Sequence, residues 1–248
     1  MRYLSAVLFA FLISFQLSDT KLTAQQIIDK TMIASGADKV GNSQIKFKFR
    51  DIEYLATRRL NGEFELIRTK KKKKVGKISD ILSNTGFRRE INANAFAVPD
   101  SMANKYANSV NSVHYFSVLP YGLNDEAVRK KLLPSAIIKG KEYYKIEVTF
   151  SENGGGEDFE DVFIYWIGKK DFLIDYLAYS YHTNGGGKRF RVLKEQCVKN
   201  GIRFVDYHNY EPLTKSISLI DLDTAFENNQ LKKISEIVLE DIQVTILN

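Results

Sequence analysis

Apolar and polar residues alternate with a period of two over much of the chain, which is typical of strands with one buried face. Five runs rich in aromatic and β-branched residues follow one another with only short turns between them. They are residues 142–150, 161–167, 172–182, 188–196 and 201–210. A parallel return needs a crossover of about a dozen residues, so these turns predict antiparallel neighbours. We therefore expect a β-meander over residues 142–210.

The part of the chain before the meander predicts further strands. Ile45, Phe47 and Phe49 alternate with basic residues, and the alternation continues, after a slip near Asp51, to about residue 60. We expect one long strand with a bend or bulge at this slip. Asn61-Gly62 is typical of a tight hairpin turn. Further strand pieces are expected at residues 78–83 and 87–91, and a last strand at 232–247.

Helical patterns occur in four segments. Thr23, followed by Gln26 and then by Gly36, predicts a capped helix over residues 23–35. A second helix should start at Pro99 and run to about residue 118, because apolar residues recur at helical spacing there. A third, short helix is expected at 125–132, ended by Pro134, and residues 219–230 have a possible helix. Together these elements predict one α+β domain dominated by antiparallel sheet.

The N-terminus has the features of an export signal. Arg2 precedes an apolar run, residues 3–15, that is too short to span a bilayer. We therefore expect a signal peptide at residues 1–24, a mature domain at 25–248 and a periplasmic or extracellular location. A buried N-terminal helix is the alternative. Removing residues 1–24 lowers the net charge from +6 to +5, a modest excess that gives little support to nucleic acid as a partner.

Sequence stretches across residues 25–246 resemble a poorly characterised family of secreted bacterial proteins. They are NSVNSV at 108–113, LPYGLND at 119–125, DVFIYWI at 161–167 and DYLAYSY at 175–181. The order of elements also resembles the LolA-like superfamily of periplasmic lipoprotein-sorting carriers. That resemblance implies a strongly curved antiparallel sheet, an incomplete barrel, with helices covering its concave side, here including a helical insert at about 99–133. It further implies a hydrophobic cavity that binds lipids or acyl chains.

Some members of the secreted family are labelled deoxyribose-phosphate aldolase, and this sequence does not support that activity. In its usual setting the reaction needs strands and helices that alternate around a barrel and a desolvated lysine that forms a Schiff base. An antiparallel meander excludes such a barrel. The lysines here lie in runs or alternate with apolar residues, as solvated side chains do.

Our preferred hypothesis is a secreted, non-enzymatic, monomeric protein that binds an apolar or amphipathic molecule or a lipoprotein. The helix at 99–118 would act as a lid, and the inner wall would be aromatic and aliphatic. The candidate wall residues are Phe47, Phe49, Phe150, Ile164 and Trp166, and the lid residues are Tyr106, Val110 and Val113. A shift of one residue in strand register would exchange the two faces of the sheet and therefore the wall residues.

A second hypothesis is an enzyme that uses a cationic and aromatic face of the meander. Hairpin turns centred near Gly185 and near Lys199-Asn200 would align Tyr179, Arg191 and His208 in one row, beside Arg189. The same row would also suit the acidic head of an amphiphile or simply stabilise the sheet. A structural or assembly protein of the envelope, with a filled core, is the third hypothesis.

Several other features of the sequence indicate no specific reaction or ligand. The lysine run from Lys70 to Lys74 would contact anionic head groups of a membrane surface or protect an edge strand or hairpin arm from pairing. Cys197, the single cysteine, is expected to be a small packed hydrophobe. The three histidines, His114, His182 and His208, have no partner at metal-ligand spacing. The sequence therefore predicts no metal and no cofactor, and it contains no nucleophile motif of a hydrolase.

Overall fold

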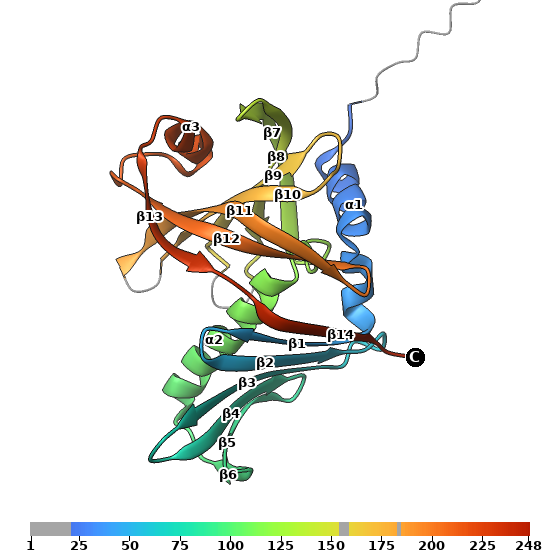
Figure 1. The fold of residues 1–248 in the computed structure, drawn as a ribbon, viewed down its shortest axis with the longest axis vertical. Helices are drawn as coiled ribbons and strands as arrows, with labels where there is room; N and C mark the ends of the chain where they lie inside the picture. The colour runs from blue at the N-terminus through green and yellow to red at the C-terminus, as the bar shows by residue number, and fades with distance from the viewer. Residues whose placement is uncertain (1–20, 154–158, 183–184) are drawn as a thin grey trace, which may run out of the picture.

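The computed structural model describes residues 21–153, 159–182 and 185–248. Its strands form two seven-stranded sheets, one above the other, and a long helix lies along the lower sheet with its upper end near the other sheet (Figure 1). All strand pairs in the described residues are antiparallel. Neither sheet closes into a barrel, so the predicted α+β class with open antiparallel strands is confirmed. The strands are shared between two sheets rather than one.

The first sheet has the strand order β14-β1-β2-β3-β4-β5-β6. Its strands are β1 (Ser43–Phe49), β2 (Ile52–Arg58), β3 (Phe64–Lys72), β4 (Gly76–Ser83), β5 (Gly86–Ile91), β6 (Asn94–Phe96) and β14 (Glu240–Ile246). The slip in alternation near Asp51 is a hairpin turn, not a bend in one strand. Phe49 pairs with Ile52, and Arg50 has a φ of 55° between them. The alternation changes phase there because the chain reverses.

The second sheet has the strand order β13-β12-β11-β10-β9-β8-β7. Its strands are β7 (Val128–Ile138), β8 (Lys141–Phe150), β9 (Val162–Gly168), β10 (Ile174–Tyr181), β11 (Gly187–Lys199), β12 (Ile202–Pro212) and β13 (Leu231–Ile237). The predicted meander, β8 to β12, is therefore confirmed. The predicted last strand is divided, because β13 ends at Ile237 in this sheet and β14 continues in the other.

The short helix expected at residues 125–132 was wrong, since this segment begins the edge strand β7. Pro134 does not end a helix. It lies where the pairing of β7 with β8 shifts, between Leu133 and Ala136. A proline removes a ladder hydrogen bond and is tolerated on an edge strand or at a bulge, and this position is both. The helical part of the predicted insert is therefore confined to the helix that precedes it.

The helices are α1 (Ala24–Ser35), α2 (Asp100–Ser117) and α3 (Leu222–Glu227), with 3-10 turns η1 (Ala37–Asn42) and η3 (Leu219–Asp221). The predicted capping box of α1 is present between Thr23 and Gln26. Gly36 ends α1 with a φ of 67°, and a Cβ atom there would collide with the carbonyl of Gly201. Glycine is thus required both by the left-handed conformation and by the close approach of the β11–β12 turn.

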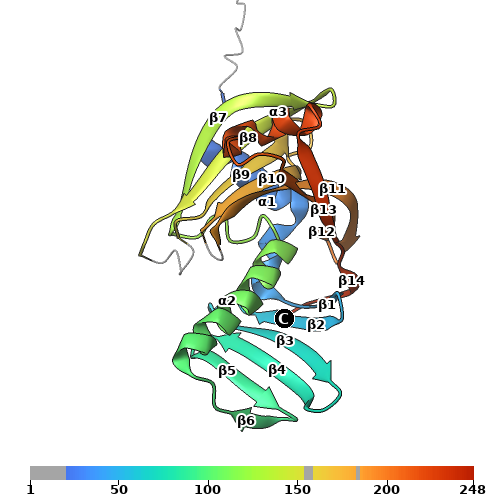
Figure 2. The same cartoon turned by 90° about the vertical axis from the view of Figure 1, so that its left-hand side faces the viewer.

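Each face of the second sheet carries its own hydrophobic core. Helix α1 lies in the concave face, as Figure 2 shows, where Ile27 and Ile28 pack with Tyr165. The opposite face packs against η3 and α3, with Trp166 and Leu222 in one cluster. Cys197 is exposed on β11, so the expectation of a packed cysteine was wrong.

Strand pairing in the meander separates residues that were expected to lie in one row. Arg191 pairs with Leu177 and Asn209, whereas His208 pairs with Val192. The register between β11 and β12 shifts between Leu193 and Glu195. This irregularity adds one residue to β11, and a shift of one residue exchanges the faces. Arg191 and His208 therefore lie on opposite faces of the sheet, and the predicted Tyr179–Arg191–His208 row was wrong.

The predicted signal peptide at residues 1–24 lies largely outside the described residues. Among the helices that are described, none combines the length and the apolar character needed to cross a membrane.

Candidate functional site: a pocket beneath helix α2

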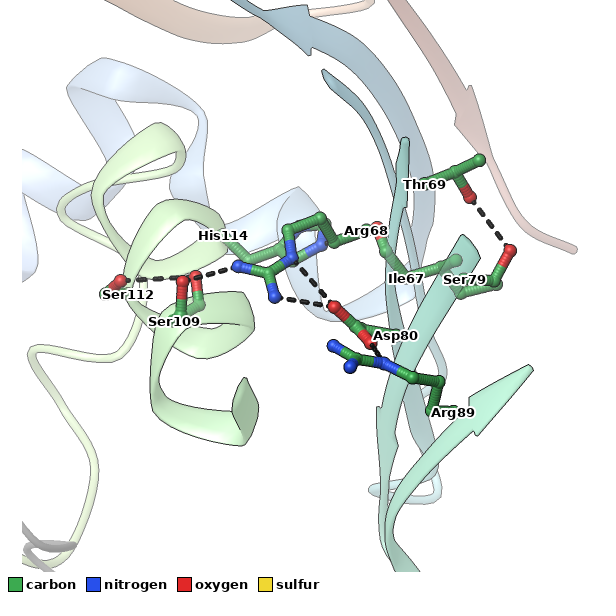
Figure 3. A network of polar contacts seen from close by, with 9 residues as sticks. All are labelled: Ile67, Arg68, Thr69, Ser79, Asp80, Arg89, Ser109, Ser112 and His114. Atoms are coloured by element: carbon green, nitrogen blue, oxygen red, sulfur yellow. Dashed lines mark hydrogen bonds and ion pairs between the residues drawn. The ribbon is translucent and has the colours of Figure 1, made fainter. Parts of the chain in front are cut away.

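Helix α2 is held over the first sheet by a buried polar network (Figure 3). Arg68 on β3 donates to Asp80 on β4 through Nε and Nη2, at 3.2 and 2.6 Å, and Nη1 reaches Ser109 Oγ on the helix. Arg89 on β5 donates to the other oxygen of Asp80. Three strands and the helix therefore meet at one carboxylate.

The network keeps Asp80 ionised although only 1% of the residue is exposed. Burial opposes its charge, but the hydrogen bonds from Arg89 and Arg68 outweigh burial and lower the pKa of Asp80 below its usual value. Arg89 also lies over the ring of Tyr106, with Cζ 3.8 Å from the ring centre. The N-terminal half of α2 is thus fixed to the sheet by charge-assisted contacts.

His114 fixes the helix one turn beyond the network. Its Nε2 is 3.2 Å from the carbonyl oxygen of Ile67, so we assign the proton to Nε2. The ring makes edge contacts with Phe47 and Tyr54 at 5.9 and 5.5 Å. Burial, and then the charge of Arg58, lower the pKa of His114 to about 3. His114 is therefore neutral at physiological pH and acts as a hydrogen-bond donor to the sheet.

The C-terminal end of α2 contacts the second sheet. The guanidinium of Arg191 lies over the ring of Phe116, with Arg191 Cζ 3.9 Å from the ring centre. The ring centres of Phe116 and Tyr179 are 5.3 Å apart. Arg191 Nη2 donates to the hydroxyl of Tyr179 at 3.2 Å. The hydroxyls of Tyr115 and Tyr165 are 3.4 Å apart. Helix α2 thus bridges the two sheets, which gives it rigid support at both ends.

A pocket of about 250 Å³ lies where α2, the segment after it and the β2–β3 hairpin meet. Leu66 and Phe64 supply an apolar wall from the sheet, and Tyr115 supplies an aromatic wall from the helix. The segment that follows α2 completes the pocket with Val118, Tyr121, Gly122 and Asp125. Successive turns stabilise this segment, for example by Tyr121 N donating to Val118 O at 2.9 Å.

The segment after α2 is anchored in the cores of both sheets. Leu119 and Leu123 are buried in the core around α1, whereas Val118 and Tyr121 pack in the core around Phe47. Its sequence is the LPYGLND motif at 119–125. Part of the pocket is therefore formed by one of the stretches that resemble the secreted bacterial family, although the motif gave no indication of a pocket.

A second pocket, of about 340 Å³, lies on the opposite face of the second sheet, between β7 and α3. Lys145 and Asp223 line it and form a buried ion pair with Nζ and Oδ2 2.8 Å apart. The indole nitrogen of Trp166 donates to the same oxygen at 2.9 Å. Lys145 Nζ also donates to Ile220 O. These contacts dock α3 on the sheet, and the pocket walls are mainly polar.

The candidate residues predicted from sequence lie in several places. Phe47, Phe49 and Val113 share the core of the first sheet, with Val110 buried beside it and Tyr106 nearer the start of the helix. Phe150, Tyr179 and Arg191 lie on the concave face of the second sheet, together with Phe163. Ile164 and Trp166 face the opposite side, towards α3. His208 lies by the edge strand β13, with Nδ1 3.3 Å from Glu236.

Sequence reasoning did not select Arg58, Leu66, Tyr115 or Tyr121, which line the pocket at α2. A signal for Arg58 was present in the alternation of β2. Tyr54, Ala56 and Arg58 occupy every second position and all three are buried. A charged residue at the buried parity of a strand is the pattern that would have identified it.

Comparison with solved structures finds similar proteins at low sequence identity and names no activity. The structure is similar to that of a LolA superfamily protein from Nitrosomonas europaea, with 10% identity, coverage of 92% of this chain and 94% of that one, and a TM-score of 0.49. An outer membrane lipoprotein-sorting protein domain from Vibrio parahaemolyticus is also similar, with 7% identity, coverage of 90% and 93%, and a TM-score of 0.49. A DUF1329 family protein from Desulfovibrio piger has 10% identity, the same coverage and a TM-score of 0.45.

No curated protein matches the chain in sequence. The model of a family of unknown function, DUF6503, matches residues 3–239. This match covers nearly the whole chain, and the chain therefore belongs to the DUF6503 family.

Proposed function

We propose that this protein is an exported, non-enzymatic binding protein that holds an apolar or amphipathic ligand, such as a lipid or a lipoprotein acyl chain, beneath α2. The observation that carries the proposal is the pocket between the β2–β3 hairpin and the helix. Its walls combine Leu66, Phe64 and Val118 with the rings of Tyr115 and Tyr121. Apolar walls with a few polar groups are typical of small-molecule sites.

The size of the pocket supports a partly enclosed ligand. Its volume of about 250 Å³ is far larger than the roughly 30 Å³ that a water molecule occupies in the liquid. It is slightly below the range of about 300–1,000 Å³ for drug-sized ligands. A head group with the first part of a chain would fit, and the rest would extend along the opening. Because Arg68 and His114 hold α2 in place, the pocket is already formed before a ligand arrives.

A substitution at the opening tests this site without changing the core. Asn111 is exposed on α2 and lines the pocket, so Asn111→Trp should fill the opening. Asn104 is exposed two turns earlier on the same face of the helix and does not line the pocket. Asn104→Trp is therefore a matched control for the cost of an added indole.

Binding is measured by titrating the purified protein with a fluorescent fatty acid and then displacing it with dodecanol or dodecanoate. We expect saturable binding by the native chain and by Asn104→Trp, and at least about tenfold weaker binding by Asn111→Trp, the loss that about 1.4 kcal/mol gives. Native mass spectrometry of the purified protein should detect a bound lipid. A native chain that binds none of these apolar compounds would contradict the carrier function.

The proposal also includes contact with an anionic membrane surface at the β3–β4 hairpin, the source from which a lipid would be loaded. Strand β3 pairs with β2 only as far as Thr69, so Lys70, Lys71 and Lys72 pair with β4 alone and the hairpin extends past the sheet. Lys71 pairs directly with Lys77. Opposed like charges destabilise a hairpin, and an anionic surface would relieve that repulsion.

Exposed apolar side chains accompany these lysines. Val75 in the hairpin turn is 41% exposed and Phe96 on β6 is 52% exposed. Asn92, in the β5–β6 turn, bonds to Val75 and Lys77 and holds this turn against the hairpin. Cations together with apolar tips are the combination that interfacial membrane contact requires.

An enzyme acting through Arg191 and His208 loses its geometric support, because these side chains lie on opposite faces of the second sheet. A protein that only assembles the envelope has no need of a preformed pocket beneath α2. We therefore favour the binding function over both alternatives.

A further inference from the structure

Arg58 is a buried cation without a protein counter-charge. It lies at the end of β2 and only 8% of the residue is exposed. Among the described residues its guanidinium has no ion pair and no hydrogen bond, and its Nη1 is buried without a partner. The guanidinium lies over the ring of Tyr121, with Cζ 5.3 Å from the ring centre. Burial lowers the pKa of Arg58, but an arginine stays protonated across the physiological range.

The other buried arginines differ from Arg58 because each donates at least one hydrogen bond, although Arg191, like Arg58, has no carboxylate partner among the described residues. Arg68 is paired with Asp80, and Arg203 donates to Gln196 and to the carbonyl of Ile174. Arg191 donates to Tyr179. An unpaired buried charge strongly destabilises a fold. A fold that leaves one such charge at a pocket is typical of a site where a ligand supplies the counter-charge.

The position of Arg58 matches this role. It lines the pocket beneath α2 together with the apolar wall of Leu66 and Phe64. The other ionisable groups that line the pocket are Arg59, Glu63, Asp125 and the tyrosines. Glu63 is exposed, and partial burial raises the pKa of Asp125 above its usual value. Of the charged residues that line the pocket, only Arg58 is in the buried class. The buried charge of the pocket is therefore positive. A guanidinium presents a planar fork of donors that fits a carboxylate or a phosphate.

We propose that Arg58 binds the anionic head group of the ligand, so that the ligand class is an anionic amphiphile with a carboxylate or phosphate head. The inference rests on the proposed function, because it assigns a head-group site within the same pocket. The head group lies against Arg58 and Tyr121, and the chain lies along Leu66 and Phe64. The aromatic ring stabilises the guanidinium while the anion is absent.

Three ligands with the same chain separate the head group from the chain. Dodecanoate carries a carboxylate, dodecyl phosphate carries a phosphate, and dodecanol is neutral. Each is titrated near neutral pH by isothermal calorimetry into the native protein. We expect both anions to bind at least about tenfold more tightly than dodecanol, because a hydrogen bond to a charged group contributes about 1.5–3 kcal/mol. The better of the two anions identifies a fatty-acid or a phospholipid source.

Substitutions then assign the effect to Arg58. Arg58→Gln should abolish the preference for anions over dodecanol, and Arg58→Lys should restore part of this preference. The matched control is Arg50→Gln, which removes a charge from an exposed residue at the opposite end of β2. The melting temperature of Arg58→Gln should equal or exceed that of the native protein, because an unpaired buried charge has been removed.

The outcomes distinguish the two proposals. If no ligand binds the native chain, the carrier function itself is overturned. If dodecanol and the anions bind equally well, or if Arg58→Gln keeps the preference for anions, the carrier function stands and the role of Arg58 is refuted. If Arg58→Gln has a melting temperature well below that of the native protein, the guanidinium is a structural group instead.

Discussion

Arg68 and Asp80 lie directly opposite each other on β3 and β4, with Nη2 and Oδ2 2.6 Å apart in a buried ion pair. The remaining edge of the guanidinium faces Ser109 on α2. Because the pocket is enclosed by the same helix and the same sheet, this pair sets the position of one pocket wall relative to the other. We therefore expect the stability of the fold and the proposed ligand binding to be coupled through the network around Asp80.

Asp80→Asn should destabilise the protein strongly. The change keeps the volume but leaves Arg68 and Arg89 without their carboxylate, and breaking a buried pair costs about 3–5 kcal/mol. The matched control is Glu65→Gln, which removes the partner of Arg88 in an ion pair that is largely exposed. Exposed pairs contribute at most about 1 kcal/mol. Urea unfolding measures both variants, and losses of similar size would contradict the role of Asp80.

His114 should make stability depend on pH between about pH 6.5 and 3. In the unfolded chain its pKa is near the ordinary 6.5, whereas in the fold it is about 3. The unfolded state therefore binds more protons in this range, and stability is complete above pH 6.5 and falls as the pH decreases. The slope from this one group approaches 1.4 kcal/mol per pH unit, about the value of one pKa unit.

The pH dependence is checked by urea unfolding of the native chain and of His114→Gln across that range. The variant should lose less stability between neutral and acidic pH, because glutamine has no proton to take up. His208→Gln serves as control, since His208 lies near Glu236 at the edge of the other sheet. If the free energy of unfolding falls in parallel with pH for the native chain and for His114→Gln, His114 is not the group that causes the pH dependence.

Lys145 and Asp223 should be coupled in their contribution to stability. Asp223→Asn leaves the ammonium of Lys145 buried without its carboxylate, and we expect a loss of about 3–5 kcal/mol. The double variant with Lys145→Met should be less destabilised than the sum of the single changes, because the unpaired charge is gone. Trp166 is the only tryptophan and donates to Asp223, so its fluorescence reports this region. Additive losses would contradict the coupling.

The β3–β4 hairpin should bind anionic bilayers. We expect the native protein to co-sediment with vesicles that contain phosphatidylglycerol, to bind less at high salt, and not to bind vesicles of phosphatidylcholine alone. Replacing Lys71, Lys72, Lys73 and Lys74 by glutamine should remove most of the binding. A matched control replaces four exposed lysines at other places, Lys30, Lys131, Lys170 and Lys232.

A contribution from apolar contact is tested separately. Phe96→Ser and Val75→Ser retain every charge but remove the exposed apolar tips. We expect them to weaken vesicle binding while its salt dependence remains. If the control lysine variant loses as much binding as the hairpin variant, the contact is a non-specific effect of net charge.

The sequence by itself determined the local structure of this chain. Runs of aromatic and β-branched residues and the short turns between them predicted the order of the strands in the meander, and Thr23, Gln26 and Gly36 predicted both ends of α1. These patterns are reliable because a period of two, a capping side chain and a left-handed glycine act on a few neighbouring residues. The expected helix at 125–132 failed because Pro134 was interpreted as a helix end, although an edge strand also tolerates it.

Only the tertiary structure decided which residues meet. One extra residue in β11 placed Arg191 and His208 on opposite faces, and no local pattern marks such a bulge. The division of the strands into two sheets placed α2 along the first sheet with its end at the second, and formed a pocket around Arg58 that none of the predicted wall residues lines. Register and sheet partition depend on contacts between segments far apart in the sequence, so they are decided by the packing of the whole chain.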